Sequence, residues 1–440
     1  MWRCVAVVIA LAGVARAEGD GPIAHDAKPS ENALPALLAR TDALVKQVAR
    51  IRGLKLKKPI PHEVVDRVEL RKRLVAHASE KESAAATAAE AIALKRWGLV
   101  PLSYDYGNAV VDLMTDQIAG YYDAKTKQLT ILDTAGSDPD WAEMVFAHEL
   151  DHGLQDQAFD LEKFEKLPDA EADALSARRA LVEGDGIALM FEVVLAGHGK
   201  TAPWADPQVA EGIIQALMEP TGDSLDTAPL VLREGMEFPY REGFAFVAAL
   251  RRRHPWSAVD AAFKRPPKST EQILHVEKYT HDEKPIAIAA PAPAALPGYS
   301  IIDETVWGEL GFRVFLRSHG VTEQTANEAA AGWGGDRAIV LARSGDTDPL
   351  HAVAIARSQW DTEADAREAQ AALEHAVDDA IVGAISDQSP THTRWLAADG
   401  TVSWVERNGT SVGVVLGVPA YRAEALAAEL VPPAAQPANK

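Results

Sequence analysis

Apolar residues recur at helical intervals along much of the first 280 residues. Leu44, Val48 and Ile51 belong to such a pattern, which predicts a helix over residues 33–52 with Gly53 as its stop. An Ala-, Glu- and Lys-rich stretch over residues 64–97 predicts one or two further helices. We therefore expect a helical N-terminal region over residues 18–100.

The pattern changes after residue 100. A helix over residues 104–118 is followed by two short apolar runs, Ile118–Asp123 and Gln128–Leu132, which flank a polar turn and predict a β-hairpin. Asp138 and Pro139 then supply an N-cap and a first helical residue for the next helix. Further helices are expected over residues 169–196, 207–218, 240–252 and 270–276.

A second unit is expected after a Pro- and Ala-rich segment at residues 285–298, which should be extended as a linker or as a surface strap. Beyond it, strands are predicted at residues 338–342, 351–356, 401–405 and 410–416, with helices at 362–380 and 421–430. This indicates a C-terminal α+β domain over residues 299–431 and a disordered tail over 432–440. The fold class is α+β, with a mostly helical domain containing a small hairpin over residues 101–284.

The first seventeen residues have the pattern of a cleavable signal peptide, with Arg3, an apolar run and Ala15-Arg16-Ala17. We expect an exported, periplasmic or extracellular protein without a membrane span after cleavage. Cys4, the single cysteine, lies in this segment, so a metal site in the mature chain must use His, Asp and Glu. The formal net charge of −20 argues against nucleic acid as a partner.

One five-residue pattern carries recognisable chemistry. His148 and His152 lie four residues apart, so on a helix both imidazoles can bind one cation. Glu149 would lie beside that metal as a general base for an attacking water. The pattern therefore predicts a zinc-dependent hydrolase.

A catalytic zinc ion needs a third protein ligand and one open position. No histidine occurs between His152 and His198, which disfavours the metzincin arrangement and favours a carboxylate from the following helix. The candidates on that helix are Glu171, Asp173, Glu183, Asp185 and Glu192.

Two downstream segments resemble gluzincin metallopeptidases of the aminopeptidase N type, which implies a zincin-like catalytic domain over residues 101–284. Residues 180–185, Ala-Leu-Val-Glu-Gly-Asp, are similar to the segment that supplies their third ligand, which implies Glu183. Residues 239–247, beginning Pro-Tyr, are similar to the stretch whose tyrosine stabilises the tetrahedral intermediate, which implies Tyr240. Asp156 and Asp185 are candidates for orienting a ligand histidine.

The Gly-x-Met-Glu-Asn segment with which those aminopeptidases hold a substrate's amine is absent from this sequence. The hairpin at 118–132 occupies its place and offers an edge strand for an extended peptide. We therefore expect an endopeptidase acting on peptide or protein substrates rather than an aminopeptidase. The alternative is a catalytically silent, zincin-like protein that binds a cell-envelope partner, because the C-terminal domain carries no evident chemistry.

Overall fold

The computed structural model describes residues 8–9, 34–137, 139–197, 199, 204, 206–217, 224–252 and 254–430. The predicted signal peptide lies outside these residues except for the backbone of Val8–Ile9, as do the predicted N-cap Asp138 and the predicted tail. None of the helices in the described ranges combines the length and apolar composition needed to cross a bilayer.

The predicted N-terminal helices are present but divided. The helices are α1 (Leu34–Ala39), α2 (Thr41–Arg52), α3 (Arg67–Ala78) and α4 (Lys81–Arg96). Gly53 ends α2 as predicted, with a positive φ of 81° and its N–H bonded to the Ala49 carbonyl. The sequence did not predict β2 (His62–Val65), which lies just before α3 and pairs in parallel with β4 (Gln128–Leu132).

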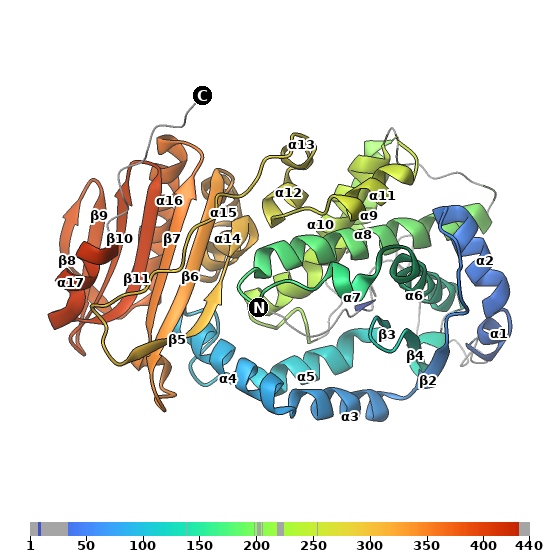
Figure 1. Cartoon of the computed structure of the whole chain (residues 1–440), viewed down its shortest axis with the longest axis horizontal. Helices are drawn as coiled ribbons and strands as arrows, with labels where there is room; N and C mark the ends of the chain where they lie inside the picture. Colours follow the sequence, from blue (N-terminus) through green and yellow to red (C-terminus); the bar gives the residue numbers. More distant parts are fainter. Residues whose placement is uncertain are drawn as a thin grey trace, which may run out of the picture.

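The predicted hairpin is confirmed as β3 (Ile118–Asp123) and β4, which pair antiparallel with Gly120 opposite Ile131. The hairpin forms the centre of a four-stranded sheet with the order β1-β3-β4-β2. Strand β1 (Val8–Ile9) pairs antiparallel with the outer edge of β3. Helix α6 (Pro139–Phe159) packs against β3, so the sheet lies beside the predicted metal motif (Figure 1).

This region contains further helices. They are α5 (Tyr106–Gln117), α7 (Leu161–Phe164), α8 (Ala172–Gly197), α9 (Pro207–Leu217), α10 (Leu230–Arg251), α11 (Ser257–Lys264), α12 (Thr270–Leu274) and α13 (Val276–Thr280). The predicted start at Tyr240 was wrong, because α10 begins at Leu230 and contains Pro239 in its interior. Proline favours the first turn of a helix, so the sequence pattern suggested a later start.

The C-terminal residues form a separate domain built on an antiparallel seven-stranded sheet with the order β5-β6-β7-β11-β10-β9-β8. The strands are β5 (Tyr299–Thr305), β6 (Trp333–Arg343), β7 (Val353–Trp360), β8 (Gly383–Ser389), β9 (His392–Ala397), β10 (Thr401–Asn408) and β11 (Ser411–Pro419). Its longer helices are α14 (Gly308–Ser318), α15 (Glu323–Ala330), α16 (Glu363–Ala380) and α17 (Ala420–Leu430). The sequence missed β5, β8, β9, α14 and α15. The segment before β5 is a strap, since Ile286 donates its N–H to the Gly334 carbonyl.

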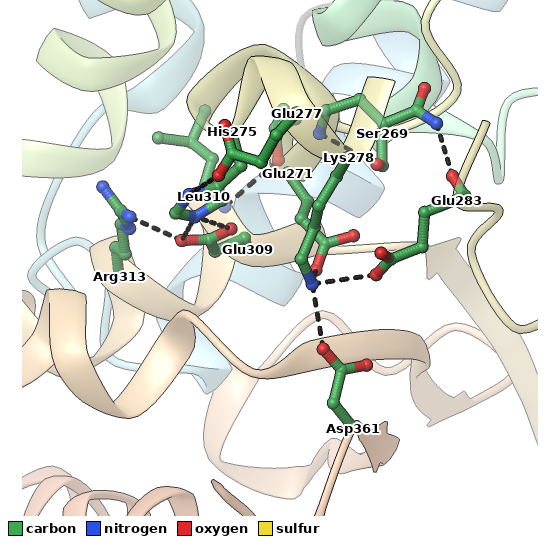
Figure 2. A network of polar contacts seen from close by, with 12 residues as sticks. Ser269, Glu271, His275, Glu277, Lys278, Glu283, Glu309, Leu310, Arg313 and Asp361 are labelled. Atoms are coloured by element: carbon green, nitrogen blue, oxygen red, sulfur yellow. Dashed lines mark hydrogen bonds and ion pairs between the residues drawn. The ribbon is translucent and has the colours of Figure 1, made fainter. Parts of the chain in front are cut away.

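The two regions meet through α14, which packs against α8, α10 and α12 (Figure 1). Figure 2 shows the polar part of this joint. The Lys278 ammonium group on α13 lies 2.6 Å from Glu271, 2.9 Å from Glu283 and 2.9 Å from Asp361. One ammonium group therefore forms ion pairs with three carboxylates. His275 contacts the buried Glu309 of α14 at 3.0 Å.

The stability of this joint should depend on pH through His275. The hydrogen bond to Glu309 raises the pKa of His275, with burial and Arg313 opposing and Glu277 assisting. The stabilisation is therefore complete below the unfolded pKa of about 6.5 and is lost as pH rises through the folded pKa. His275→Gln should cost about 1–2 kcal/mol at pH 5.5 and clearly less at pH 9, measured by urea unfolding. An equal cost at both pH values would contradict this account.

Helices α8 and α10 cross very closely at two glycines. A Cβ atom built on Gly184 would lie 2.1 Å from the Gly243 carbonyl carbon, and one on Gly243 would lie 2.0 Å from the Ala180 oxygen. Only hydrogen side chains allow this approach, so these positions set the separation of the two helices.

Gly184→Ala should destabilise the protein by about 1–3 kcal/mol, because the added methyl group overlaps backbone atoms of α10. Gly197→Ala is the matched control on the same helix, since a Cβ there meets nothing within 4 Å. Denaturant unfolding should show a loss for the first variant and no loss for the second. Equal stability of the two variants would be incompatible with the tight crossing.

Candidate metal centre

Three predicted ligands from two helices converge at one point. His148 and His152 lie one turn apart on α6, and Glu183 faces them from α8. The Nε2 atoms of His148 and His152 lie 3.2 Å and 3.4 Å from the same Glu183 oxygen, Oε2. A tetrahedral zinc site with bonds of 2.0–2.2 Å separates its ligand atoms by about 3.4 Å. The donor set and its spacing therefore fit a divalent metal.

Packing against α8 fixes the direction of these side chains. All three ligands are buried, with His148 1%, His152 4% and Glu183 4% exposed. A Cβ atom on Gly186 would lie 2.6 Å from His148 Cε1, so this glycine makes room for the imidazole. Sequence reasoning did not identify Gly186, because its role depends on a contact with another helix.

The ligand cluster is strongly polarised without a metal. Burial would raise the pKa of Glu183, but His152 and His148 lower it to about 2. Burial would lower the pKa of His152, but Glu183 brings it to about 10. Because a ligand imidazole must be neutral, binding of a metal ion here would be coupled to the release of a proton from His152.

Glu149 projects beside the ligands from the next position on α6. The side chain is fully buried, and no side chain among the described residues bonds either carboxylate oxygen, although the backbone N–H of Tyr122 on β3 lies close enough to lower its pKa. Burial raises the pKa of Glu149 to about 8, against the opposing effect of His152. A Cβ atom on Gly120 would lie 3.3 Å from Glu149 Cγ, so β3 runs directly beside this carboxyl group. A carboxyl group without a side-chain partner, next to the three ligands, is suited to exchanging a proton with a water or substrate.

Tyr240 lies next to His148. Its ring stacks against His148 with centroids 6.4 Å apart and an interplanar angle of 28°. The side chain is 3% exposed and lies one helical turn before Gly243, the residue of the close crossing. The structure therefore brings together every residue that the resemblance implied for metal binding and catalysis.

Gln155 orients His152, which the sequence analysis missed. His152 Nδ1 lies 2.9 Å from Gln155 Oε1, so the imidazole donates through Nδ1 and keeps Nε2 for a metal. The Gln155 amide group donates in turn to Asp151 at 3.0 Å and Asp185 at 3.0 Å, which fixes its orientation. The signal available in the sequence was the spacing of three residues from His152, which places both side chains on one helix face.

Arg52 supports this network from the end of α2. Its guanidinium group is fully buried and binds both Asp185 oxygens, at 2.8 Å and 3.0 Å. Asp185 therefore acts on His152 through Gln155 and not by the direct contact expected from the sequence. The N-terminal helices thereby contribute to the metal centre.

Asp156, the other expected partner of a histidine, serves a different function. It accepts hydrogen bonds from the Tyr122 hydroxyl at 2.8 Å and from Lys127 at 3.0 Å, which attach the hairpin to α6. The other candidates for the third ligand also have other partners: Glu171, just before α8, binds Arg337, Asp173 binds Thr270, and Glu192 binds Arg251. Glu183 is thus the α8 carboxylate that the structure places between the histidines.

Comparisons with known proteins reach only the C-terminal domain. Residues 299–427 match a family model described as a domain of unknown function (DUF8575). Comparisons with curated proteins and with solved structures gave no match. The metal centre lies outside the matched residues, so its assignment depends on its own geometry.

Gln155→Met should weaken zinc binding about 10–100-fold, because the variant keeps the side-chain volume but no longer holds His152 in the metal-binding tautomer. Competition with a chromogenic chelator measures this affinity. Gln157→Met on the same helix is the control, since Gln157 bonds the backbone of residues 57 and 58 near the surface. Equal zinc affinities in the two variants would show that Gln155 does not tune the site.

Proposed function

We propose that this protein is an exported zinc metallopeptidase with a gluzincin-type site, which hydrolyses internal bonds of peptides or proteins. The observation that carries the proposal is the convergence of His148, His152 and Glu183, beside the buried carboxyl group of Glu149, which no described side chain bonds. Export is proposed from the signal-like pattern of residues 1–17 alone.

Zinc is the metal that best suits this donor set. Two imidazoles and one carboxylate leave one tetrahedral position open, as in catalytic zinc sites, whereas a structural site would be closed by a fourth protein ligand. When bound, zinc would lower the pKa of a coordinated water and polarise the substrate carbonyl.

The surrounding residues would move the protons and stabilise charge. Glu149 would take a proton from the attacking water and pass it to the leaving amine, which are the two tasks of a general base and acid. The Tyr240 hydroxyl would donate a hydrogen bond to the oxyanion that develops on the substrate carbonyl. Both groups are buried, and the low local dielectric strengthens these interactions.

The outer edge of β3 supports a peptide as the substrate. Gly120 on this strand packs against Glu149, and β1 pairs with the same edge through Gly120 and Ile118. Because residues 8–9 occupy this edge in the structure, it would accept an extended substrate chain, with the scissile bond near the metal, once the proposed signal peptide has been removed. Because an extended chain can continue past the site in both directions along a strand, this arrangement favours an endopeptidase.

Glu149→Gln should keep zinc at wild-type stoichiometry and lower the rate of cleavage of an unfolded protein substrate by at least about 10²-fold, since general acid–base catalysis contributes that much. Glu143→Gln is the matched control, because Glu143 lies on the same helix and pairs with Arg40 outside the site. Zinc removal by a chelator should abolish wild-type cleavage, and added zinc should restore it.

Full cleavage activity in Glu149→Gln would exclude this mechanism. A wild-type protein that binds zinc but cleaves none of a broad set of unfolded proteins and peptides would instead support the silent binding protein.

A further inference from the structure

Helix α10 contains a proline next to Tyr240, its proposed catalytic residue, and this proline interrupts the backbone hydrogen bonds of the helix. Pro239 has no N–H group, so the Gly235 carbonyl lacks the partner that an uninterrupted helix would provide. Tyr240 follows directly. The position of its hydroxyl therefore depends on how the two halves of α10 are held relative to each other.

A buried ion network spans this interruption. Glu234, two turns before Arg241, accepts a hydrogen bond from the Arg241 guanidinium group at 2.9 Å. Its second oxygen accepts from Arg317 at 2.6 Å, and Arg317 belongs to α14 of the C-terminal domain. Glu234 is only 4% exposed, and Arg241 and then Arg317 outweigh burial and lower its pKa. Both guanidinium groups are thus needed to offset the cost of burying this charge.

Helix α14 is itself held in place by hydrogen bonds and ion pairs. Asp336 of β6 accepts hydrogen bonds from the N–H groups of Trp307 and Gly308, both at 2.9 Å, and so fixes the start of α14. The contacts of His275 with Glu309 and of Lys278 with Asp361 join the same domain to α12 and α13 (Figure 2). Arg317 is therefore anchored to a rigid support rather than to a free surface.

We propose that Arg317 is a positioning residue for Tyr240. By holding Glu234, and through it Arg241, the C-terminal domain fixes how the two halves of α10 are oriented at Pro239 and so the location of the Tyr240 hydroxyl in the site. This inference rests on the proposed peptidase function. It gives the matched domain of unknown function a task within the same active site.

The first test compares two arginines of α14. Arg317→Met should lower kcat on the order of tenfold or more with little change in KM, because a small displacement of a group that acts in the transition state costs mainly the chemical step. Zinc affinity should stay at the wild-type value, since the three ligands lie on α6 and α8. Arg313→Met removes the same charge from the same helix, where Arg313 contacts Glu309 and not α10, and should leave kcat unchanged.

The second test asks whether the effect passes through Tyr240. Affinity for a phosphonate peptide, which mimics the tetrahedral intermediate, is measured for wild type, Arg317→Met, Tyr240→Phe and the double variant. Arg317→Met should weaken binding in the wild-type background and add almost nothing in the Tyr240→Phe background. Glu234→Gln keeps the side-chain size and should reproduce the loss, which provides a second route if Arg317→Met does not fold.

The outcomes distinguish a failure of the role of Arg317 from a failure of the proposed peptidase function. An equal loss in both backgrounds, or wild-type phosphonate affinity in Glu234→Gln, would overturn the role of Arg317 while leaving the peptidase assignment intact. A wild-type protein without zinc-dependent cleavage or phosphonate binding would overturn the proposed function itself.

Discussion

Helix α8 must approach two other helices at once, and the candidate site depends on that constraint. On one side it presents Glu183 to the histidines of α6, with Gly186 leaving room for His148. On the other side Gly184 lies against Gly243 of α10, which brings Tyr240 to the same histidines. Each glycine lowers the intrinsic stability of its helix by about 1 kcal/mol relative to alanine. The close packing that both permit gives a physical reason for this composition.

The parts of the fold that follow local rules could be predicted from the sequence. The hairpin has its predicted limits at Ile118–Asp123 and Gln128–Leu132, and Gly53 ends α2 as expected. The parts that depend on partners distant in sequence could not. Strand β2 has only four residues and is a strand because it pairs with β4. Helix α10 continues through Pro239 because neighbouring helices hold it.

The same distinction applies to the site. His148, Glu149 and His152 follow from a spacing of a few residues, and the resemblance added Glu183 and Tyr240. Gln155 was within reach of a helical-face argument, but Arg52 was not, because it acts across 133 residues of sequence. Asp156 was one of two candidates for orienting a histidine, and the sequence could not show the direction of its side chain, which contacts Tyr122 and Lys127.

The charge around the site supports the assignment of a divalent cation. The carboxyl groups of Glu149, Asp151, Glu183 and Asp185 are all buried there, and Arg52 supplies a permanent positive charge through its ion pair with Asp185. Burial raises the pKa of Asp151 as well as that of Glu149, so without a metal these groups tend to keep their protons. A dication between His148, His152 and Glu183 would offset the excess negative charge and favour ionised Glu149, the form that a general base requires. The network from Arg52 through Asp185 and Gln155 would then have two roles. Gln155 holds His152 in the orientation that a metal needs, and Arg52 neutralises the charge of Asp185.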